Sequence, residues 1–406
     1  MKRMISLLSL CLLLGMVITA RAEETVSVSP LVLQQLNTAR EAMEKEQYDQ
    51  AGQLLNKLAQ QKLSPPEQAY VHQFLGNLAL QKGQERQALK QFKAAWELDA
   101  LTRHDQRRLL HTIGQLQMTL EQWQEGVASL EHWIKQVTAA GKVSEEVRAE
   151  DHLLLAQGYA QMERWQRVIG PIKTAIRMKG RAPEAWYRLQ LAAHYQLKQW
   201  QGATAVLQLL TERYPQTSRY WEQLASVYQI RNRYEDALAT LRAGWIGGHL
   251  NKERHHLWLA RLMMQQGVPQ RAAEVLEESI RKGQVRDTIK HQRLLAQAQL
   301  SAKRYEQGRE TLRRIAQRKP DYDTWRQLAY LELQLKRWDD MKRSIDQAVA
   351  LKPDAAELLL LRGIADINRA EFEQARSSFE RARAHKGTRD QATSWLNYLE
   401  QVQGRS

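Results

Sequence analysis

The sequence contains little cysteine, proline and glycine. Its one cysteine, Cys11, lies in the apolar N-terminal run, so loss of that segment would leave no disulfide, no thiolate nucleophile and no cysteine metal ligand. Only nine prolines and twenty glycines occur among 406 residues, and no stretch is low in complexity. We therefore find no linker that would divide the chain into globular parts, and we expect its stability to come from packing alone.

Motifs of catalysis and cofactor binding are also missing. His255 and His256 are adjacent, and adjacent helical residues point about 100° apart, so they form a poor chelate without the HExxH frame of zinc enzymes. No phosphate-binding loop follows Gly247-Gly248, and no serine has a GxSxG context. These absences favour a non-enzymatic protein without cofactor or metal. A wall hydrolase with a dispersed site is the enzyme alternative.

The N-terminus carries the long hydrophobic run of this sequence. Lys2 and Arg3 precede the apolar stretch 5–20, and Ala20-Arg21-Ala22 forms a small-x-small cleavage site. This order is typical of a secretory signal peptide, and we predict that residues 1–22 are that peptide, with cleavage after Ala22. The run is short for a membrane anchor and its far flank has little positive charge. Any membrane association of the mature chain would therefore be peripheral.

A repeated helix pair accounts for most of the remaining sequence. Within residues 221–244, apolar residues recur at i, i+3, i+4 and i+7 along two predicted helices, which a short polar turn at 230–233 separates. Small Ala225 and Ala237 fall where the two helices must come closest. The order Trp, Leu, small, Tyr, then aromatic, Ala, Leu, small recurs at about 34 residues and resembles the tetratricopeptide repeat.

The small residue of each second helix sets the phase of the repeats. These residues are Ala51, Ala88, Gly126, Val168, Ala203, Ala237, Ala272, Gly308, Met341 and Ala375. From Ala203 onward they lie 33 to 36 positions apart, whereas earlier intervals reach 42 and imply longer loops such as 139–142. Aromatic residues are predicted to open or precede second helices at Trp123, Trp165, Trp200, Tyr234, Tyr305, Trp338 and Phe372.

These patterns predict an all-α fold, a right-handed superhelical tetratricopeptide solenoid of about ten helix pairs. We expect it to run continuously over residues 23–403, with looser repeats to about 182, regular repeats over about 183–387 and a capping helix over about 388–403. The cap would place Trp395, Leu396 and Leu399 on one side. The twelve tryptophans mostly occupy repeat positions and are interpreted as core.

Basic residues outnumber acidic ones by 60 to 45. Loss of the basic residues of the signal peptide leaves 57 to 45, and the segment 281–319 alone has twelve basic residues against three acidic ones. Such a surface attracts acidic partners and speeds their encounter. A secreted chain has little access to nucleic acid, so the expected ligands are acidic protein segments, anionic lipid head groups or wall polymers. The alternative is a solvated face that serves solubility.

Repeat geometry narrows the candidate binding residues, because positions two, five and nine of each first helix usually face the groove in tetratricopeptide proteins. In this sequence they are Arg219, Glu222, Arg254, Arg261, Lys290, Arg293, Gln297, Arg326 and Tyr330. Basic side chains at this spacing would grip carboxylates bidentately. The Lys/Asn set of chaperone-binding tetratricopeptide domains is missing, so capture of a C-terminal peptide is not predicted.

Several strings resemble a narrower family: SPLVLQQLNTAREAMEKEQYDQA, AWYRLQLAAHYQLKQW, RYPQTSRYWEQLASVYQIRNRYEDALATLRAGWIGGHLNKE, LWLARLMMQQGVPQRAAEVLEESIRKGQV and QATSWLNYLEQ. They are similar to the periplasmic tetratricopeptide proteins encoded beside TonB, ExbB and ExbD energy-transducing systems in gammaproteobacteria. The resemblance covers nearly the whole mature chain, and the segment 267–285 is its most distinctive part. It implies a periplasmic adaptor with an accessory role in TonB-dependent uptake across the outer membrane, whose partners are components of that complex. The alternative is a cell-envelope assembly scaffold that binds peptidoglycan or lipid.

Overall fold

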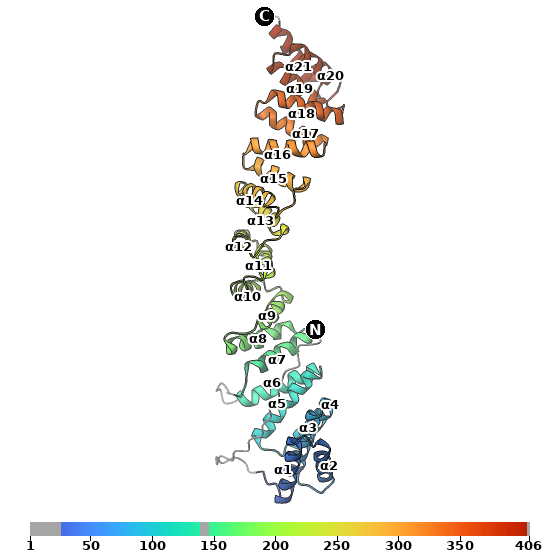
Figure 1. Cartoon of the computed structure of the whole chain (residues 1–406), viewed down its shortest axis with the longest axis vertical. Helices are drawn as coiled ribbons and strands as arrows, with labels where there is room; N and C mark the ends of the chain where they lie inside the picture. Colours follow the sequence, from blue (N-terminus) through green and yellow to red (C-terminus); the bar gives the residue numbers. More distant parts are fainter. Residues whose placement is uncertain (1–25, 139–145, 404–406) are drawn as a thin grey trace. The chain divides into compact units, whose positions relative to one another are not determined.

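The structure of the protein is a computed structural model that describes residues 26–138 and 146–403. Every regular element within these two ranges is an α-helix, which confirms the all-α prediction (Figure 1). The predicted signal peptide and the connecting loop 139–142 lie outside the described residues. None of the helices within the two ranges is long and apolar enough to cross a bilayer.

The helices divide between two compact units, Met1–Val206 and Leu207–Ser406, whose boundary lies inside α10 (Trp200–Arg213). The helices before this boundary are α1 (Pro30–Glu44), α2 (Tyr48–Ala59), α3 (Pro65–Gln81), α4 (Glu85–Glu97), α5 (Arg103–Thr119), α6 (Trp123–Thr138), α7 (Ala149–Gln161), α8 (Trp165–Lys179) and α9 (Glu184–Gln196). The helices after it are α11 (Ser218–Ile230), α12 (Tyr234–Ile246), α13 (Glu253–Gln265), α14 (Pro269–Arg281), α15 (Ile289–Ser301), α16 (Tyr305–Arg318), α17 (Tyr322–Gln334), α18 (Trp338–Leu351), α19 (Ala356–Asn368), α20 (Phe372–Arg383) and α21 (Arg389–Gln403).

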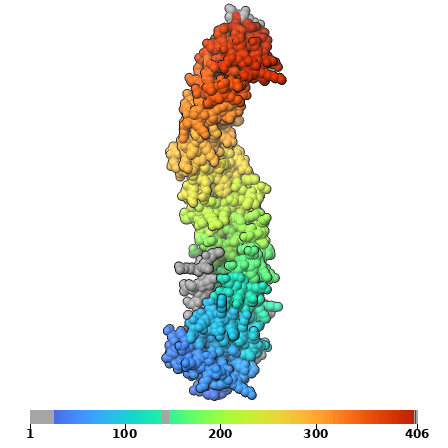
Figure 2. Space-filling model, turned by 90° about the vertical axis from the view of Figure 1, so that its right-hand side faces the viewer, coloured from blue at the N-terminus to red at the C-terminus, as the bar shows by residue number. Residues whose placement is uncertain are grey.

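Odd-numbered and even-numbered helices from α1 to α20 are the first and second helices of ten pairs, and α21 follows the last pair. Within each unit the pairs stack in chain order, as the colour sequence of Figure 2 also shows, so each pair contacts those before and after it. The pairs and the final helix agree with the predicted architecture. The continuity of the array over residues 23–403 and its right-handed course stay predictions.

The two helices of every pair are joined by the same turn. One residue of each turn has a positive φ: Glu46, Gly83, Glu121, Glu163, Lys198, Asn232, Gly267, Lys303, Lys336 and Ala370. The N–H of the next residue donates to the carbonyl five positions earlier, as from Arg233 to Tyr228 at 2.8 Å. This Schellman arrangement satisfies the last carbonyls of the first helix. Eight of the ten residues are not glycine, and except at Asn232, whose side chain tolerates this region, the left-handed backbone costs about 1 to 2 kcal/mol at each.

Small residues let the paired helices approach closely, as the sequence predicted. Ala225 and Ala237 are both fully buried. A Cβ on Gly308 would lie 2.6 Å from Leu300 Cδ2, and a Cβ on Gly363 would lie 2.5 Å from the ring of Phe379. Larger residues at these positions would overpack the helix crossing.

Aromatic residues begin most second helices. Each of the seven predicted aromatic residues, from Trp123 to Phe372, is the first residue of its helix, whereas α14 begins at Pro269. In α21, Leu396 and Leu399 are buried, and the ring of Trp395 stacks on that of Phe379 with centroids 5.7 Å apart. These contacts fit the predicted cap.

The interpretation of the tryptophans as core residues was too broad. Of the twelve, Trp133, Trp186 and Trp325 are buried and the others are half-buried. In these helix pairs most tryptophans therefore keep one edge at the surface while the rest of the ring packs against the core.

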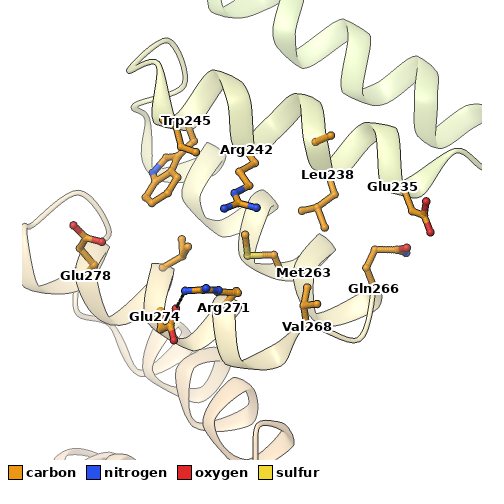
Figure 3. A pocket seen from close by; sticks show the side chains of 13 residues that line it. Glu235, Leu238, Arg242, Trp245, Met263, Gln266, Val268, Arg271, Glu274 and Glu278 are labelled. Carbon is orange, nitrogen blue, oxygen red and sulfur yellow. Dashed lines mark hydrogen bonds and ion pairs between the residues drawn. The ribbon is translucent and has the colours of Figure 1, made fainter.

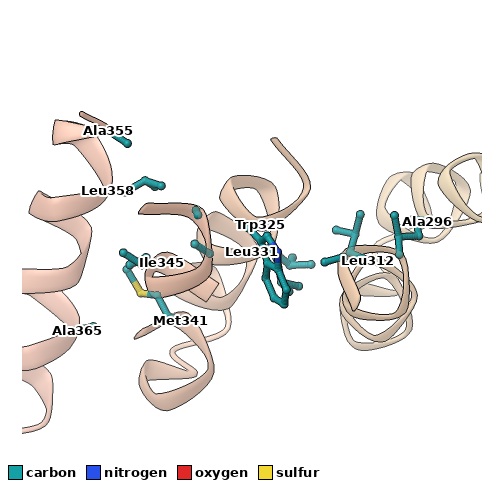
Figure 4. Packing of buried hydrophobic residues seen from close by; sticks show 14 residues of the cluster. Ala296, Leu312, Trp325, Leu331, Met341, Ile345, Ala355, Leu358 and Ala365 are labelled. Atoms are coloured by element: carbon teal, nitrogen blue, oxygen red, sulfur yellow. The ribbon is translucent and has the colours of Figure 1, made fainter. Parts of the chain in front are cut away.

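The pairs from α15 to α19 enclose a continuous apolar cluster. Trp325 of α17 packs in it together with Met341 and Ile345 of α18 (Figure 4). First and second helices both contribute side chains to this cluster. Packing between neighbouring pairs therefore stabilises each pair in addition to the packing within it.

Buried ion pairs also link consecutive pairs at this end of the chain. Glu332 of α17 accepts a hydrogen bond from Ser344 Oγ at 2.7 Å and lies 3.7 Å from the guanidinium of Arg309 on α16. One repeat later, Asp366 of α19 lies 2.9 Å from Lys342 Nζ on α18. A cation of one second helix therefore meets a buried carboxylate of the next first helix, which favours a single register between pairs.

Candidate partner-binding surface

The nine residues predicted to face the groove lie on four first helices of the Leu207–Ser406 unit. They are Arg219 and Glu222 on α11, Arg254 and Arg261 on α13, Lys290, Arg293 and Gln297 on α15, and Arg326 and Tyr330 on α17. Glu222 and Arg326 are half-buried, and the other seven are exposed. All nine therefore reach the surface, as contact with a partner requires.

Ion pairs join the first helices of consecutive repeats. Arg254 Nη2 donates to Glu222 Oε1 at 2.7 Å, which links α13 to α11. Arg293 Nη2 donates to Asp321 Oδ2 at 2.9 Å, immediately before α17. Three of the six predicted cations have a carboxylate partner, since Arg326 also lies 3.8 Å from a carboxylate of α19. These three side chains connect repeats in addition to facing solvent.

His255 supports the first of these ion pairs. Its Nδ1 accepts a hydrogen bond from the N–H of Lys252 at 3.2 Å, so its Nε2 carries the proton and donates to Glu222 Oε1 at 3.0 Å. Burial lowers the pKa of His255, which keeps the ring neutral. Burial alone would raise the pKa of Glu222, but hydrogen bonds from Arg254 and His255 hold it below its usual range.

Three other predicted cations remain without a carboxylate. Within residues 26–138 and 146–403, no ion pair joins Arg219, Arg261 or Lys290 to an acidic side chain, and all three are exposed. They lie on α11, α13 and α15. Of the predicted set, these side chains are the ones most available to an acidic ligand.

The basic segment 281–319 is less positive in the structure than its composition suggests. Six of its twelve basic residues form ion pairs: Lys282 with Glu278, Arg286 with Glu253, Arg293 with Asp321, Arg304 with Glu277, Arg309 with Asp340 and Arg318 with Asp287. Five of these six carboxylates lie outside the segment. Counting charges along the sequence therefore overstates the positive charge of this surface.

A hollow between second helices was not predicted. A cavity of about 600 Å³ opens between α12, α13 and α14, with Leu238 and Met263 among its lining residues (Figure 3). Trp245, which the sequence assigned to the core, forms part of its wall. The sequence carried little signal for it: the positions equivalent to Leu238 in later second helices are Ala273, Arg309, Lys342 and Arg376, but those in three earlier ones are the apolar Leu89, Val127 and Ile169.

The described side chains offer no evident metal site. No group of three or more histidine, cysteine or acidic side chains in the part of the chain that the structure describes is placed to hold a metal ion. His256 instead bonds through Nδ1 to Ser279 Oγ at 2.7 Å.

Residues 257–323 match the family model for the tetratricopeptide repeat. The matched residues run from α13 to α17 and include the distinctive turn before α14. This repeat match supports a role in protein–protein interaction for the chain. A search of the curated proteins found no matching sequence.

Solved structures with similar helical arrangements are distant. The structure of Naa15/Naa10 bound to HypK-THB is 12% identical, with 91% of this chain and 66% of that chain covered and a TM-score of 0.47, so this chain spans less than two thirds of it. The crystal structure of MamA is 14% identical over 41% of this chain and 97% of that one, with a TM-score of 0.33. A tetratricopeptide repeat protein from Parabacteroides merdae is 15% identical over 62% and 98%, with a TM-score of 0.31.

Proposed function

We propose that this protein is a non-enzymatic periplasmic adaptor that binds acidic segments of partner proteins, and that it is an accessory component of a TonB-dependent outer-membrane transport system. The exposed cations Arg219, Arg261 and Lys290, which have no carboxylate partner among the described residues, are the observation that carries the proposal. The sequence resemblance to periplasmic proteins encoded beside TonB, ExbB and ExbD supports the proposed location and partners.

In the proposed mechanism, one set of residues attracts the acidic partner segment and another set holds the binding surface in place. Unpaired guanidinium and ammonium groups attract an acidic segment over about a Debye length and then form charge-assisted hydrogen bonds with its carboxylates. The ion pair between Arg254 and Glu222 holds neighbouring first helices in register, so that the unpaired cations keep a constant spacing. Binding therefore requires no opening of an existing ion pair.

A cell-envelope scaffold is the second candidate. The same unpaired cations would also accept the phosphates of anionic lipids or the carboxylates of peptidoglycan, because a cation recognises the charge and not the molecule that carries it. In that case the protein would bind purified peptidoglycan or anionic vesicles and show no affinity for TonB, ExbB or ExbD.

The test compares two triple variants that change net charge equally. Replacing Arg219, Arg261 and Lys290 with Glu should weaken binding of purified TonB, ExbB or ExbD periplasmic domains at least tenfold at low salt, and less at high salt. The control replaces the exposed cations Lys90, Arg281 and Lys319, which lie away from the first-helix surface, and should bind like the wild type.

Two results would decide against the adaptor proposal. Equal binding by both triple variants would remove the first-helix surface as the binding site. Wild-type binding to peptidoglycan or anionic vesicles, with none to the three transport components, would favour the scaffold. Circular dichroism melting of both variants checks that the fold is retained.

A further inference from the structure

The hollow between α12, α13 and α14 exposes apolar surface that a soluble repeat usually covers. Ile246 is 67% exposed and Val268 is 39% exposed, and both line the cavity of about 600 Å³. Leu238, Met263 and Val275 add further apolar lining. A concave apolar surface with a few charged groups at its edge is the usual form of a binding pocket.

The wall of the hollow is held in place by buried hydrogen bonds. Trp245 Nε1 donates to His256 Nδ1 at 3.2 Å, and the two rings meet edge to face with centroids 6.3 Å apart. His256 is 1% exposed and also bonds to Ser279 Oγ of α14, which is fully buried. Because an indole N–H only donates, Nδ1 is the acceptor and the ring is neutral. Trp245 is therefore fixed before any ligand arrives.

Some of the charged side chains around the hollow form ion pairs and others do not. Arg271 Nη1 pairs with Glu274 Oε2 at 2.8 Å, and Glu278 Oε1 pairs with Lys282 Nζ at 2.6 Å. Within the described residues, Arg242 of α12 has no acidic partner, and Glu235 near the start of α12 has no cationic one. Figure 3 shows the guanidinium of Arg242 pointing toward Met263, while the side chain of Arg271 runs toward Glu274. Because Arg271 is already paired with Glu274, Arg242 is the cation that a carboxylate entering the hollow would meet.

We propose that this hollow is a second docking site, which binds a partner protein segment that presents a bulky apolar side chain beside a carboxylate. The apolar side chain contacts Leu238, Met263 and Val268, and the carboxylate pairs with Arg242. The carboxylate of the occupant is selected at Arg242 alone, because Glu274 and Glu278 are already paired and Glu235 lies beyond Leu238 from Arg242 (Figure 3). The site is lined mainly by the second helices α12 and α14, and none of the nine residues of the first-helix surface lines it.

The test uses a phage-displayed library of random 16-residue peptides as the probe. Peptides are selected on the wild-type chain and counter-selected on Ala239→Trp, in which an indole at an exposed lining position fills the hollow. The matched control is Ala243→Trp, an exposed alanine one turn along α12 that does not line the hollow. We expect enriched peptides to pair Leu, Phe or Trp with Asp or Glu, and to bind Ala239→Trp at least tenfold more weakly than Ala243→Trp.

A charge reversal tests the role of Arg242. Selection on Arg242→Glu should replace acidic residues with Lys or Arg in the enriched peptides and keep the apolar residue. Failure to enrich any peptide over the Ala239→Trp background, or enrichment with no change of charge on Arg242→Glu, would overturn the proposal. Replacing Arg219, Arg261 and Lys290 with Glu should leave peptide binding unchanged, which separates this site from the first-helix surface.

Discussion

Replacing Glu332 with glutamine should remove a pH-dependent loss of stability from the C-terminal helix pairs. Glu332 is 1% exposed, and burial, with a contribution from nearby Asp340, raises its pKa from 4.5 to about 7. The folded state therefore binds this proton more tightly than the unfolded state does. Stability is fully present below about pH 4.5 and is lost as the pH rises to about 7, because the folded chain must then hold a buried carboxylate with only partial compensation.

The magnitude follows from the two pKa values. A rise from 4.5 to about 7 corresponds to about 3 kcal/mol of lost stability once the pH exceeds both values. Glutamine carries no charge to bury, and its carbonyl oxygen still accepts the hydrogen bond of Ser344. The chain already contains such a pair, since Ser129 Oγ donates to Gln117 Oε1 at 2.7 Å. Glu332→Gln should therefore be more stable than the wild type by about 2 to 3 kcal/mol near pH 8, with a much smaller difference near pH 5.

Hydrogen exchange measured by mass spectrometry is the suitable assay, because repeats open locally and a single melting temperature averages over them. The opening free energy of α16 to α18 should fall between about pH 5 and about pH 8 in the wild type and stay level in Glu332→Gln. The exposed Glu310→Gln variant of α16 is the matched control and should keep the wild-type slope. A wild-type opening free energy that does not change with pH, or an equally steep slope in Glu332→Gln, would refute the reasoning.

Two further substitutions test the geometry of the helix pairs by urea unfolding. Ala370→Gly should stabilise the chain by about 1 kcal/mol, because Ala370 holds a φ of 60° that glycine adopts without strain, and the converse change Gly267→Ala should destabilise it by a similar amount. Ala237→Trp should destabilise by about 3 kcal/mol by overpacking a fully buried helix crossing, while the exposed Ala243→Trp should not; equal midpoints for these two variants would show that the assigned crossing is wrong.

The fold class was predictable because its determinants recur along the chain. Ala225 and Ala237 lie at one crossing, and small residues return at the position of Ala237 in every second helix except α8 and α18, which have Val168 and Met341. Most repeats therefore carried the same pattern independently. Aromatic residues such as Trp338 correctly predicted the first residue of their second helices. The turns were less visible, because a residue such as Ala370 carries no sequence signal for a left-handed backbone and adopts it to satisfy the carbonyls of the preceding helix.

The candidate sites were only partly predictable. Periodicity placed all nine first-helix residues at the surface, but it did not show that Arg254 pairs with Glu222 while Arg261 has no acidic partner among the residues that the structure describes. Long charged side chains have many rotamers, and the carboxylate that each one reaches depends on how the next pair packs. The same limit explains why the segment 281–319 looked more basic in sequence than it is in the structure.

The sequence by itself determined that this protein is a series of antiparallel helix pairs, because close packing requires small residues at each crossing and those residues repeat. Only the tertiary structure decided where the surface is open to a partner. The hollow beside Trp245 is lined by side chains of α12, α13 and α14 together, so it depends on how these three helices pack. The charge of its edge depends on which carboxylates Arg271 and Lys282 have already bound. Both properties depend on distances between neighbouring repeats. The sequence of a single repeat does not specify those distances.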